Sequence, residues 1–370
     1  MSATASQLRL SGWRGLVLFA TIGGAGAAFL SIRFGFATTT HLVDSFPSGL
    51  YLGLNVFCGI ALAAGALTIA SMASVMGGPE WRAVGRACLL AGALSYVVAI
   101  LGKVANDAAP RWQVWFQAWK ARSLLSGAGW TIIVLALLLF VEFLPQYSVR
   151  IARARWFAVL NRFDLPLLIV ATVLAAVHQF GLSSLIRLSE TKFSPLWTGP
   201  SLPSLFYLSS VVFGLAILLF ASWRSLLAFR KTLPARLQPI LARLLTAAVF
   251  IYLCLRILDL VKRGLFWSMF TGSREGLLMV LEVALLLCGM LWIRGSGTQP
   301  RELFVGSALI ILGVIANRLN TAITALETGM RQNHLPHWSE FLIAYSLIAA
   351  GVVGFALAVE HLAVFVDLEA

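Results

Sequence analysis

The chain has 370 residues, of which 59% are hydrophobic and only 12% are charged. Because a soluble protein of this size carries roughly 25% charged residues and cannot hide so much apolar surface in one core, the composition excludes a soluble globular protein. The formal net charge of +13 is spread over nearly every predicted loop, which excludes one compact basic nucleic-acid domain and favours contact with anionic lipid.

Apolar segments long enough to cross about 30 Å of hydrocarbon recur along the whole chain. They predict an all-α, polytopic integral membrane protein with a single membrane domain over residues 1–370. In chain order, the ten predicted spans are 12–32, 50–76, 84–104, 123–144, 157–179, 203–222, 238–260, 276–293, 303–324 and 341–365.

An even number of spans places both termini on one side of the membrane, here called the terminal side; the opposite side is called the distal side. Lys and Arg are slightly more numerous on the terminal side, which predicts cytoplasmic termini. The first span contains the glycine-rich stretch TIGGAGAAF and is long enough to remain in the membrane, so no cleavable signal peptide is required. Its glycines, Gly23, Gly24 and Gly26, are interpreted as helix-packing positions.

Hydrogen-bonding and ionisable side chains gather near the distal ends of six spans. Such groups are costly inside a membrane and usually mark function. In chain order they are Asn55, Lys103, His178 with Gln179, Arg256 with Asp259, Glu282, and Asn317 with Arg318, Thr321 and Thr324. Their common depth predicts a buried polar site close to the distal leaflet.

Several of these residues also have a purely structural interpretation. Arg256 and Asp259 are three residues apart on one helix face, where they can neutralise each other. Lys103, at the end of its span, can extend its amine to the interface, and His178 can be an ordinary interfacial residue. Glu282 lies six residues inside its span, so its carboxyl group must be protonated or partnered.

The histidines and cysteines argue against a metal centre. A transmembrane b-type cytochrome is expected to hold haem between histidine pairs at matched depth. The five histidines are His41, His178, His334, His337 and His361. Only two of them lie at span ends, on opposite sides. Each of the four cysteines stands alone in a different span, and no C-x-x-C occurs. The sequence therefore predicts no haem, no iron–sulfur cluster and no other metal site in this chain.

The polar site fits a quinone. The sequence has no nucleotide-binding loop, H-E-x-x-H or G-x-S-x-G motif. A quinone's carbonyl oxygens accept hydrogen bonds and its reduction takes up two protons, which imidazole can deliver near neutral pH with a carboxylate as relay. Two alternatives remain: a structural anchor without a redox site, and a small-molecule transporter, although transporters typically bind substrate at the midplane on broken helices.

The stretch HQFGLSSLIRLSETKFSPLW, followed by LPSLF, is the most specific of an ordered series of motifs. Its informative positions are His178, Gln179, Ser184, Leu185, Pro195, Leu196, Trp197, Leu202 and Pro203. The series continues with FPSG before the second span, Arg256-x-x-Asp259, Glu282, Arg318, and LPHWSE with Pro336, Trp338 and Glu340. Together these motifs resemble the polysulfide-reductase membrane-subunit (NrfD-like) family, and within it the HybB-type membrane subunit of periplasmic nickel–iron hydrogenases.

This resemblance implies two four-helix bundles with flanking helices, in a quinone-binding subunit of the bacterial inner membrane. The quinone would be menaquinone or ubiquinone. A periplasmic ferredoxin-like iron–sulfur subunit would exchange electrons with it and connect to a hydrogenase or molybdopterin catalytic subunit. The implied quinone-binding residues are His178, Gln179, Arg256, Asp259, Trp197 and Asn55; the implied proton relay is Asp259, Glu282 and Lys103; Arg318 and Asn317 give electrostatic support.

The sequence departs from the family pattern at carboxylates. Asn55 stands where the pattern has an aspartate, Asn106 and Asp107 are not followed directly by an arginine, and Gly127 replaces a glutamate. An amide keeps a hydrogen bond but cannot release a proton. These departures argue against transmembrane proton pumping and leave quinone binding open.

Overall fold

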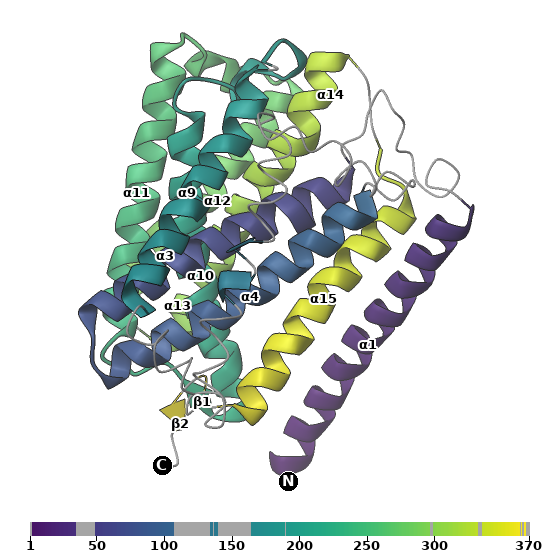
Figure 1. Cartoon of the computed structure of the whole chain (residues 1–370). Coiled ribbons are helices and arrows are strands. Elements are labelled where there is room, and N and C mark those ends of the chain that lie inside the picture. The colour runs from purple at the N-terminus through teal and green to yellow at the C-terminus, as the bar shows by residue number, and fades with distance from the viewer. Residues whose placement is uncertain are drawn as a thin grey trace.

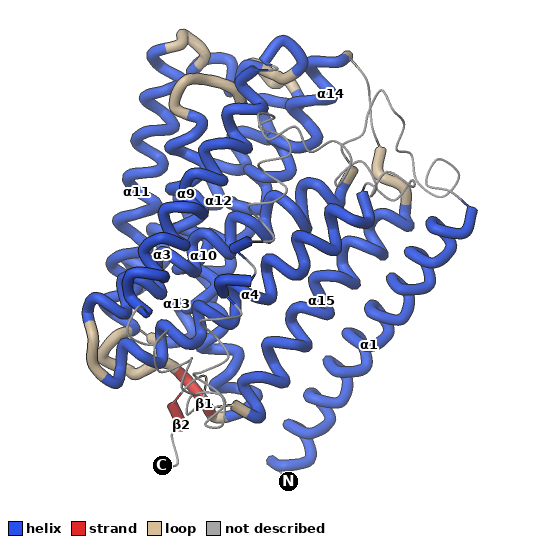
Figure 2. Tube along the Cα trace, viewed as in Figure 1, coloured by secondary structure: helices blue, strands red, loops and turns tan. Residues whose placement is uncertain are grey.

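The computed structural model describes residues 2–34, 49–106, 134–135, 137–139, 164–188, 190–296, 299–331, 335–362, 364 and 366–367. This part of the chain is almost entirely helical (Figures 1 and 2). Within it, eight helices are long and apolar enough to cross a membrane, and Val17–Leu30 is a shorter apolar segment. The predicted all-α polytopic fold is confirmed.

The α-helices follow one another in chain order, with short helical turns between some of them. They are α1 (Ser2–Phe34), α3 (Cys58–Met76), α4 (Pro79–Asn106), α9 (Asp164–Leu188), α10 (Leu202–Phe229), α11 (Gln238–Lys262), α12 (Arg274–Ser296), α13 (Pro300–Leu319), α14 (Ala325–Met330) and α15 (Trp338–His361). Two π-helical turns, η1 (Leu52–Phe57) and η6 (Asn320–Thr324), precede α3 and follow α13. The 3-10 turns are η3 (Glu190–Lys192), η4 (Pro195–Trp197) and η5 (Phe266–Phe270).

The helix containing His178 is longer than the predicted span. The sequence predicts an end at Gln179, whereas α9 continues to Leu188. The segment FGLSSLIRL contains no proline and keeps apolar residues at helical spacing, so the backbone continues to form helix beyond the most apolar part. His178 therefore lies ten residues, or roughly 15 Å, from the distal end of α9. The predicted span 123–144 falls outside the described residues except for helical residues at 134–135 and 137–139.

Helix α10 occupies the middle of the molecule. It packs against α3 and α9 on one side and against α11 and α13 on the other, while α12 packs against α11 and α13. Helix α15 contacts α4, and α1 runs along α15 at the edge of the assembly (Figure 1). Residues of α10 can thus contribute to polar sites on either side of it.

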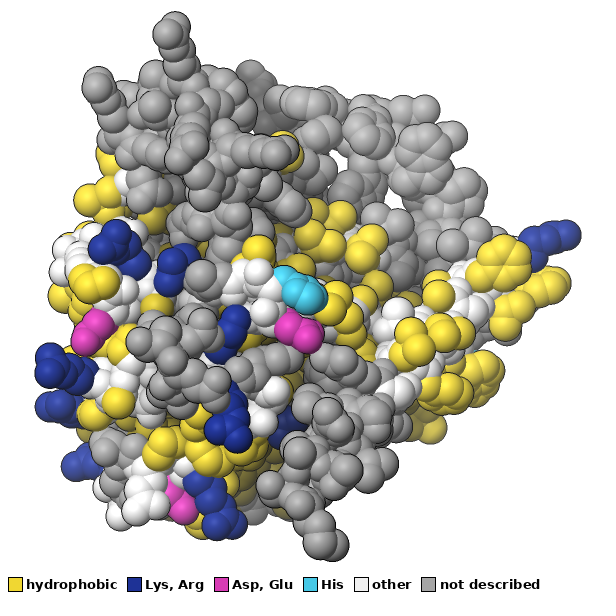
Figure 3. All heavy atoms as spheres, turned by 90° about the horizontal axis from the view of Figure 1, so that it is seen from below, with side chains coloured by type: hydrophobic (Ala, Val, Ile, Leu, Met, Phe, Trp, Pro, Cys, Tyr) yellow, Lys and Arg dark blue, Asp and Glu magenta, His cyan; other side chains and the backbone are white. Residues whose placement is uncertain are grey.

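Both ends of the chain lie on one side of the helix assembly. The start of α1 lies at the same end of the molecule as the strand pair β1 (Lys231–Thr232) and β2 (Val366–Asp367), as Figure 1 shows. The strands are antiparallel, with Lys231 opposite Asp367. Figure 3 views this end and shows Lys and Arg side chains scattered across the face.

Glycine allows the closest helix contacts. A Cβ added to Gly65 of α3 would collide with the backbone carbonyl of Ser210 in α10, and one added to Gly24 of α1 would collide with Ser346 of α15. The predicted packing role of Gly24 therefore agrees with the structure. The same prediction for Gly26 is wrong for the part of the chain that the structure describes, where no atom lies within 4 Å of its Cβ position.

Candidate functional site

A buried carboxylate on α12 forms the centre of a polar cluster. Glu282 is fully buried and accepts three hydrogen bonds. Trp197 Nε1 donates to Oε2 at 3.1 Å, while Tyr252 Oη and Asn317 Nδ2 donate to Oε1 at 3.3 and 2.8 Å. These side chains, here called the Glu282 cluster, come from η4, α11, α12 and α13. The carboxyl group thus acts as an acceptor only, the role of an ionised carboxylate.

The segment 190–200 carries Trp197 into this cluster. The backbone N–H of Ser194 donates to the carbonyl of Ala325 at 2.7 Å, and Arg263 Nη1 donates to the carbonyl of Pro195 at 2.6 Å. Two contacts from separate helices therefore hold the segment over the helix ends. Trp197, predicted to be a quinone-binding residue at the edge of a pocket, is fully buried and hydrogen-bonded to Glu282.

The predicted pairing of Arg256 with Asp259 does not form. Asp259 Oδ2 instead lies 2.7 Å from Nη2 and 2.9 Å from Nε of Arg263, one helical turn further along α11. Arg263 also binds the carbonyl of Pro195, so its side chain is drawn to the distal surface beside Asp259. Gly199 packs against this ion pair with φ +147, a conformation that favours glycine.

The two interior arginines lack carboxylate partners among the described residues. Arg256 is 1% exposed, and its Nη2 reaches only the thioether sulfur of Met279, at 3.6 Å. Arg318 is fully buried; its Nη2 donates to the carbonyl of Phe206 and to Ser209 Oγ, both at 2.8 Å. Its guanidinium carbon lies 3.9 Å from the centre of the Phe206 ring, a cation–π contact. Arg256 Nε and Arg318 Nε and Nη1 have no hydrogen-bond partner within the described ranges.

His178 and Gln179 lie on α9, which packs against α3 and α10. His178 is 3% exposed and both of its ring nitrogens lack a hydrogen-bond partner; Gln179 is 1% exposed and its Nε2 also lacks one. Most buried polar groups in proteins are bonded, so these nitrogens mark a position where a ligand or water completes the structure. No hydrogen bond between described residues joins this pair to the Glu282 cluster.

Asn55 is fully buried but is not bonded to the Glu282 cluster. Its Nδ2 donates to the carbonyl of Ala344 in α15 at 3.0 Å, and its side chain occupies the space where a Cβ on Gly102 of α4 would lie. Lys103, next to Gly102, is half-buried. The expectation that six spans send their polar groups into one cluster is therefore met only in part: Trp197, Glu282 and Asn317 are bonded together, whereas Asn55 joins α15.

Two π-helical turns face each other near these sites. η1, which contains Asn55, contacts η6 and α13. The predicted polar stripe on the ninth span continues into η6, where Thr321 Oγ1 donates to the carbonyl of Asn317 at 2.8 Å and Thr324 bonds Asn320. These threonines are therefore bonded within their own helix. Single π turns inside helices frequently occur at functional sites.

Two residues of the site escaped sequence reasoning. Tyr252 is four residues before Arg256 and Arg263 is four residues after Asp259, so each shares a helix face with a residue that was singled out. That spacing is the signal that could have found them. Tyr252 bonds Glu282, and Arg263 holds both Asp259 and the segment 190–200.

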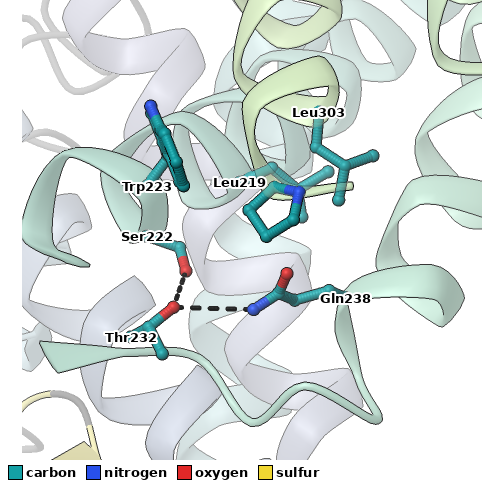
Figure 4. A pocket seen from close by; sticks show the side chains of 7 residues that line it. Leu219, Ser222, Trp223, Thr232, Gln238 and Leu303 are labelled. Carbon is teal, nitrogen blue, oxygen red and sulfur yellow. Dashed lines mark hydrogen bonds between the residues drawn. The ribbon is translucent and has the colours of Figure 1, made fainter. Parts of the chain in front are cut away.

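A small pocket lies at the opposite end of the molecule from the Glu282 cluster. Its lining, drawn in Figure 4, is Leu219, Ser222, Trp223, Thr232, Gln238, Pro300 and Leu303. The Ser222 and Thr232 hydroxyls are 2.9 Å apart, and Gln238 Nε2 donates to Thr232 Oγ1 at 3.5 Å and to the carbonyl of Leu233 at 3.1 Å. These polar groups bond one another, so the pocket offers few free partners to a ligand.

The fold and its buried ionisable groups define an all-α polytopic membrane protein with polar sites inside the helix assembly. No family model matches the sequence. The chain is similar to a protein of Nitratidesulfovibrio vulgaris (strain Hildenborough), with 24% identity over 343 residues, which are 88% of this chain and 87% of that protein. It is also similar to the probable Ni/Fe-hydrogenase 2 b-type cytochrome subunit of Escherichia coli K12, with 23% identity over 349 residues, 91% of this chain and 88% of that subunit.

The second relative agrees with the resemblance to a hydrogenase membrane subunit, while the wider NrfD-like family stays a prediction. It corrects another expectation. The prediction that the chain holds no haem is contradicted, because this relative is named as a b-type cytochrome subunit. The prediction required histidine pairs, but a single axial histidine can hold haem iron, and His41 and His334 lie outside the described residues.

Proposed function

We propose that this chain is the membrane anchor and quinone-reactive subunit of a multi-subunit oxidoreductase in the bacterial inner membrane, with cytoplasmic termini. The similarity to a subunit named for a nickel–iron hydrogenase supports the complex, and the apolar helices support the anchor. The two chain ends on one side, where basic residues lie, support the orientation (Figures 1 and 3). A periplasmic ferredoxin-like iron–sulfur subunit, linked to a hydrogenase or molybdopterin catalytic subunit, would dock on the distal side.

The observation that carries the quinone proposal is the pair of unsatisfied side chains on α9. His178 and Gln179 are buried, and their ring and amide nitrogens lack partners. Quinone carbonyl oxygens accept hydrogen bonds, so Gln179 Nε2 and a protonated His178 ring nitrogen can orient the head group. On reduction, the His178 N–H can deliver a proton to the quinone oxygen.

The Glu282 cluster would serve proton movement. Tyr252 donates its hydroxyl proton to the Glu282 carboxylate, so the pair can pass a proton between α11 and α12, with Asn317 fixing the carboxylate. Asp259, buried beside the part-exposed Arg263 near the distal end of α11, would pass that proton towards the aqueous side, as would Lys103 on α4. This assignment gives the buried carboxyl group a role consistent with its three donors.

The name of the Escherichia coli relative makes haem a second candidate cofactor for this subunit. An axial imidazole needs a ring nitrogen free of other bonds, and His178 meets this requirement among the described histidines because both of its ring nitrogens are unpartnered. His178 would hold the iron, and haem would supply one-electron transfer. Haem ligation and quinone binding are alternative uses of the same side chain, which the following measurement separates.

The test compares the purified complex with its His178→Ala variant. We expect the variant to assemble with its partners but to lose electron transfer to quinone, while His361→Ala on the exposed terminal end of α15 keeps wild-type turnover. Quinone is measured in the lipid extract and haem by its pyridine adduct. Normal quinone turnover in His178→Ala removes the site assignment. A complex that carries iron–sulfur clusters but never reduces quinone is a structural anchor, and a chain without redox partners favours a transporter.

A further inference from the structure

The interior around Glu282 carries more positive than negative charge. Arg256 and Arg318 are both essentially fully buried, and Glu282 is the buried carboxylate beside them. Neither arginine forms a salt bridge within the part of the chain that the structure describes, because Asp259 is paired with Arg263 and both Glu282 oxygens are occupied by neutral donors. Two guanidinium groups against one carboxylate leave a net charge of one positive unit.

The excess charge is accompanied by unsatisfied donors. Arg256 Nε, Arg318 Nε and Arg318 Nη1 are buried without a partner. Arg256 Nη2 contacts only the Met279 sulfur, which is a weak acceptor. Arg318 Nη2 is bonded to Phe206 and Ser209, but the other buried N–H groups lack an acceptor, and leaving them unbonded is unfavourable. An acceptor from outside the chain would remove both costs.

The two guanidinium groups flank the same hydroxyl–carboxylate pair. Tyr252 lies one turn before Arg256 on α11 and donates to Glu282, while Arg318 follows Asn317, which donates to the same carboxylate. Arg256 Nη2 also contacts the sulfur of Met279, which lies one turn before Glu282 on α12. Arg318 lies against Phe206 of α10, so the unsatisfied N–H groups belong to one locality between α10, α11, α12 and α13.

We propose that this locality binds a small monovalent anion, of the halide class, held by the unpartnered N–H groups of Arg256 and Arg318. A water molecule would satisfy an N–H group but would leave the net charge inside the membrane, whereas an anion satisfies both the hydrogen bonds and the charge. Glu282 does not take this role because Trp197, Tyr252 and Asn317 already occupy its oxygens. The site is separate from the quinone position proposed at His178 and does not depend on it.

Chloride is the probe for the test. The purified protein is unfolded by heat in detergent at constant pH and ionic strength while gluconate is replaced stepwise by chloride. Binding to the folded state alone raises the unfolding temperature in proportion to the logarithm of chloride concentration above the dissociation constant. We expect this rise in the wild-type protein and its loss in Arg256→Gln, where the net charge falls to zero.

Two further variants separate an anion site from a structural role. Glu282→Gln raises the net charge of the locality to two positive units, so we expect chloride to act at lower concentration than in the wild type. Arg274→Gln removes an exposed arginine that pairs with Glu327 and should keep the wild-type chloride response. The comparison is the chloride response within each variant, so a lower stability of the variant itself does not affect it.

Arg256→Lys provides the remaining check if the glutamine variant does not fold, because it keeps the charge and should keep a chloride response. A wild-type unfolding temperature independent of chloride overturns the proposal and assigns water to these N–H groups. An equal response in Arg256→Gln, or a weaker apparent affinity in Glu282→Gln, overturns it as well. Neither result bears on electron transfer at His178.

Discussion

Glu282 illustrates how a charged residue can be accommodated inside an apolar helix assembly. Its two oxygens receive donors from an indole, a phenol and an amide on three different elements. Hydrogen bonds to a charged group contribute roughly 1.5–3 kcal/mol each, and a buried group that loses one bears the desolvation cost. The stability of the cluster therefore depends on each donor individually.

Tyr252→Phe removes one of these donors without changing the shape of the side chain. We expect the free energy of unfolding to fall by about 1.5–3 kcal/mol, because Glu282 Oε1 keeps only its bond from Asn317. The measurement is unfolding in detergent followed by circular dichroism. Tyr345→Phe, on the exposed face of α15, is the matched control and should leave stability unchanged. Equal stability of the two variants would contradict the hydrogen-bond assignment.

At the level of single residues, the sequence indicated which side chains are buried and polar, but not their partners. Helical spacing allowed Asp259 to pair with Arg256 or with Arg263. Arg263 forms the pair because it can also reach the carbonyl of Pro195. That carbonyl belongs to a segment distant in sequence, and local spacing contains no information about its position.

At the level of the helices, close approach explains how polar groups from different spans reach one another. Gly65 of α3 lies against the backbone of α10 at Ser210. A Cβ added to Gly289 of α12 would lie only 2.7 Å from the carbonyl oxygen of Gly306 in α13. Without a hydrophobic driving force between helices in lipid, such van der Waals contact is a main source of association. The positions of Ser209 and Ser210, which bind Arg318, depend on it.

Gly65→Ala should separate α3 from α10. The added methyl group would overlap the Ser210 carbonyl, and overpacking of this kind costs typically about 1–3 kcal/mol. We expect a lower midpoint of thermal unfolding than in the wild type. Gly26→Ala on α1 is the control: no atom of the described residues lies near its Cβ position, and alanine is a better helix former than glycine, so stability should stay equal or rise. A similar loss in both variants would contradict the packing argument.

The extent of the helices was predictable in part. Apolar length located most of them, because crossing hydrocarbon requires a long uninterrupted apolar segment. The end of α9 was not predictable in this way. Hydropathy detects where the apolar residues end, and the helical backbone can continue beyond that point. Leu188 ends that helix nine residues after the predicted end at Gln179. The π-helical form of Leu52–Phe57 and Asn320–Thr324 likewise gave no sequence signal.

At the scale of the whole molecule, the chain begins and ends on the same side. The start of α1 and the strand β2 both lie at the end of the molecule shown in Figure 3. On this side Lys231 joins the strand pair to α15, since it precedes Thr232 in β1 and its Nζ donates to the carbonyl of Val359 at 3.0 Å. Helix α15 and the β1–β2 pair are therefore connected on this side of the molecule.

Fusion reporters test this topology. A fluorescent protein that folds only in the cytoplasm should report from both the N-terminus and the C-terminus when each is fused in turn. A reporter inserted after Gly272, in the η5–α12 connection on the distal side, should stay dark, and a periplasmic phosphatase there should be active. A signal from only one terminus would contradict the placement of both termini on one side of the membrane. Two dark terminal fusions would show that both termini are periplasmic and not cytoplasmic.

The sequence by itself determined that this is a helical membrane protein with costly polar groups at particular positions. These properties depend on local composition: apolar length and the burial cost of each side chain can be read residue by residue. Only the tertiary structure decided which groups meet. The four elements around Glu282, the shift of Asp259 to Arg263 and the unmatched charge of Arg256 and Arg318 depend on the rotation and approach of helices that are distant in the chain.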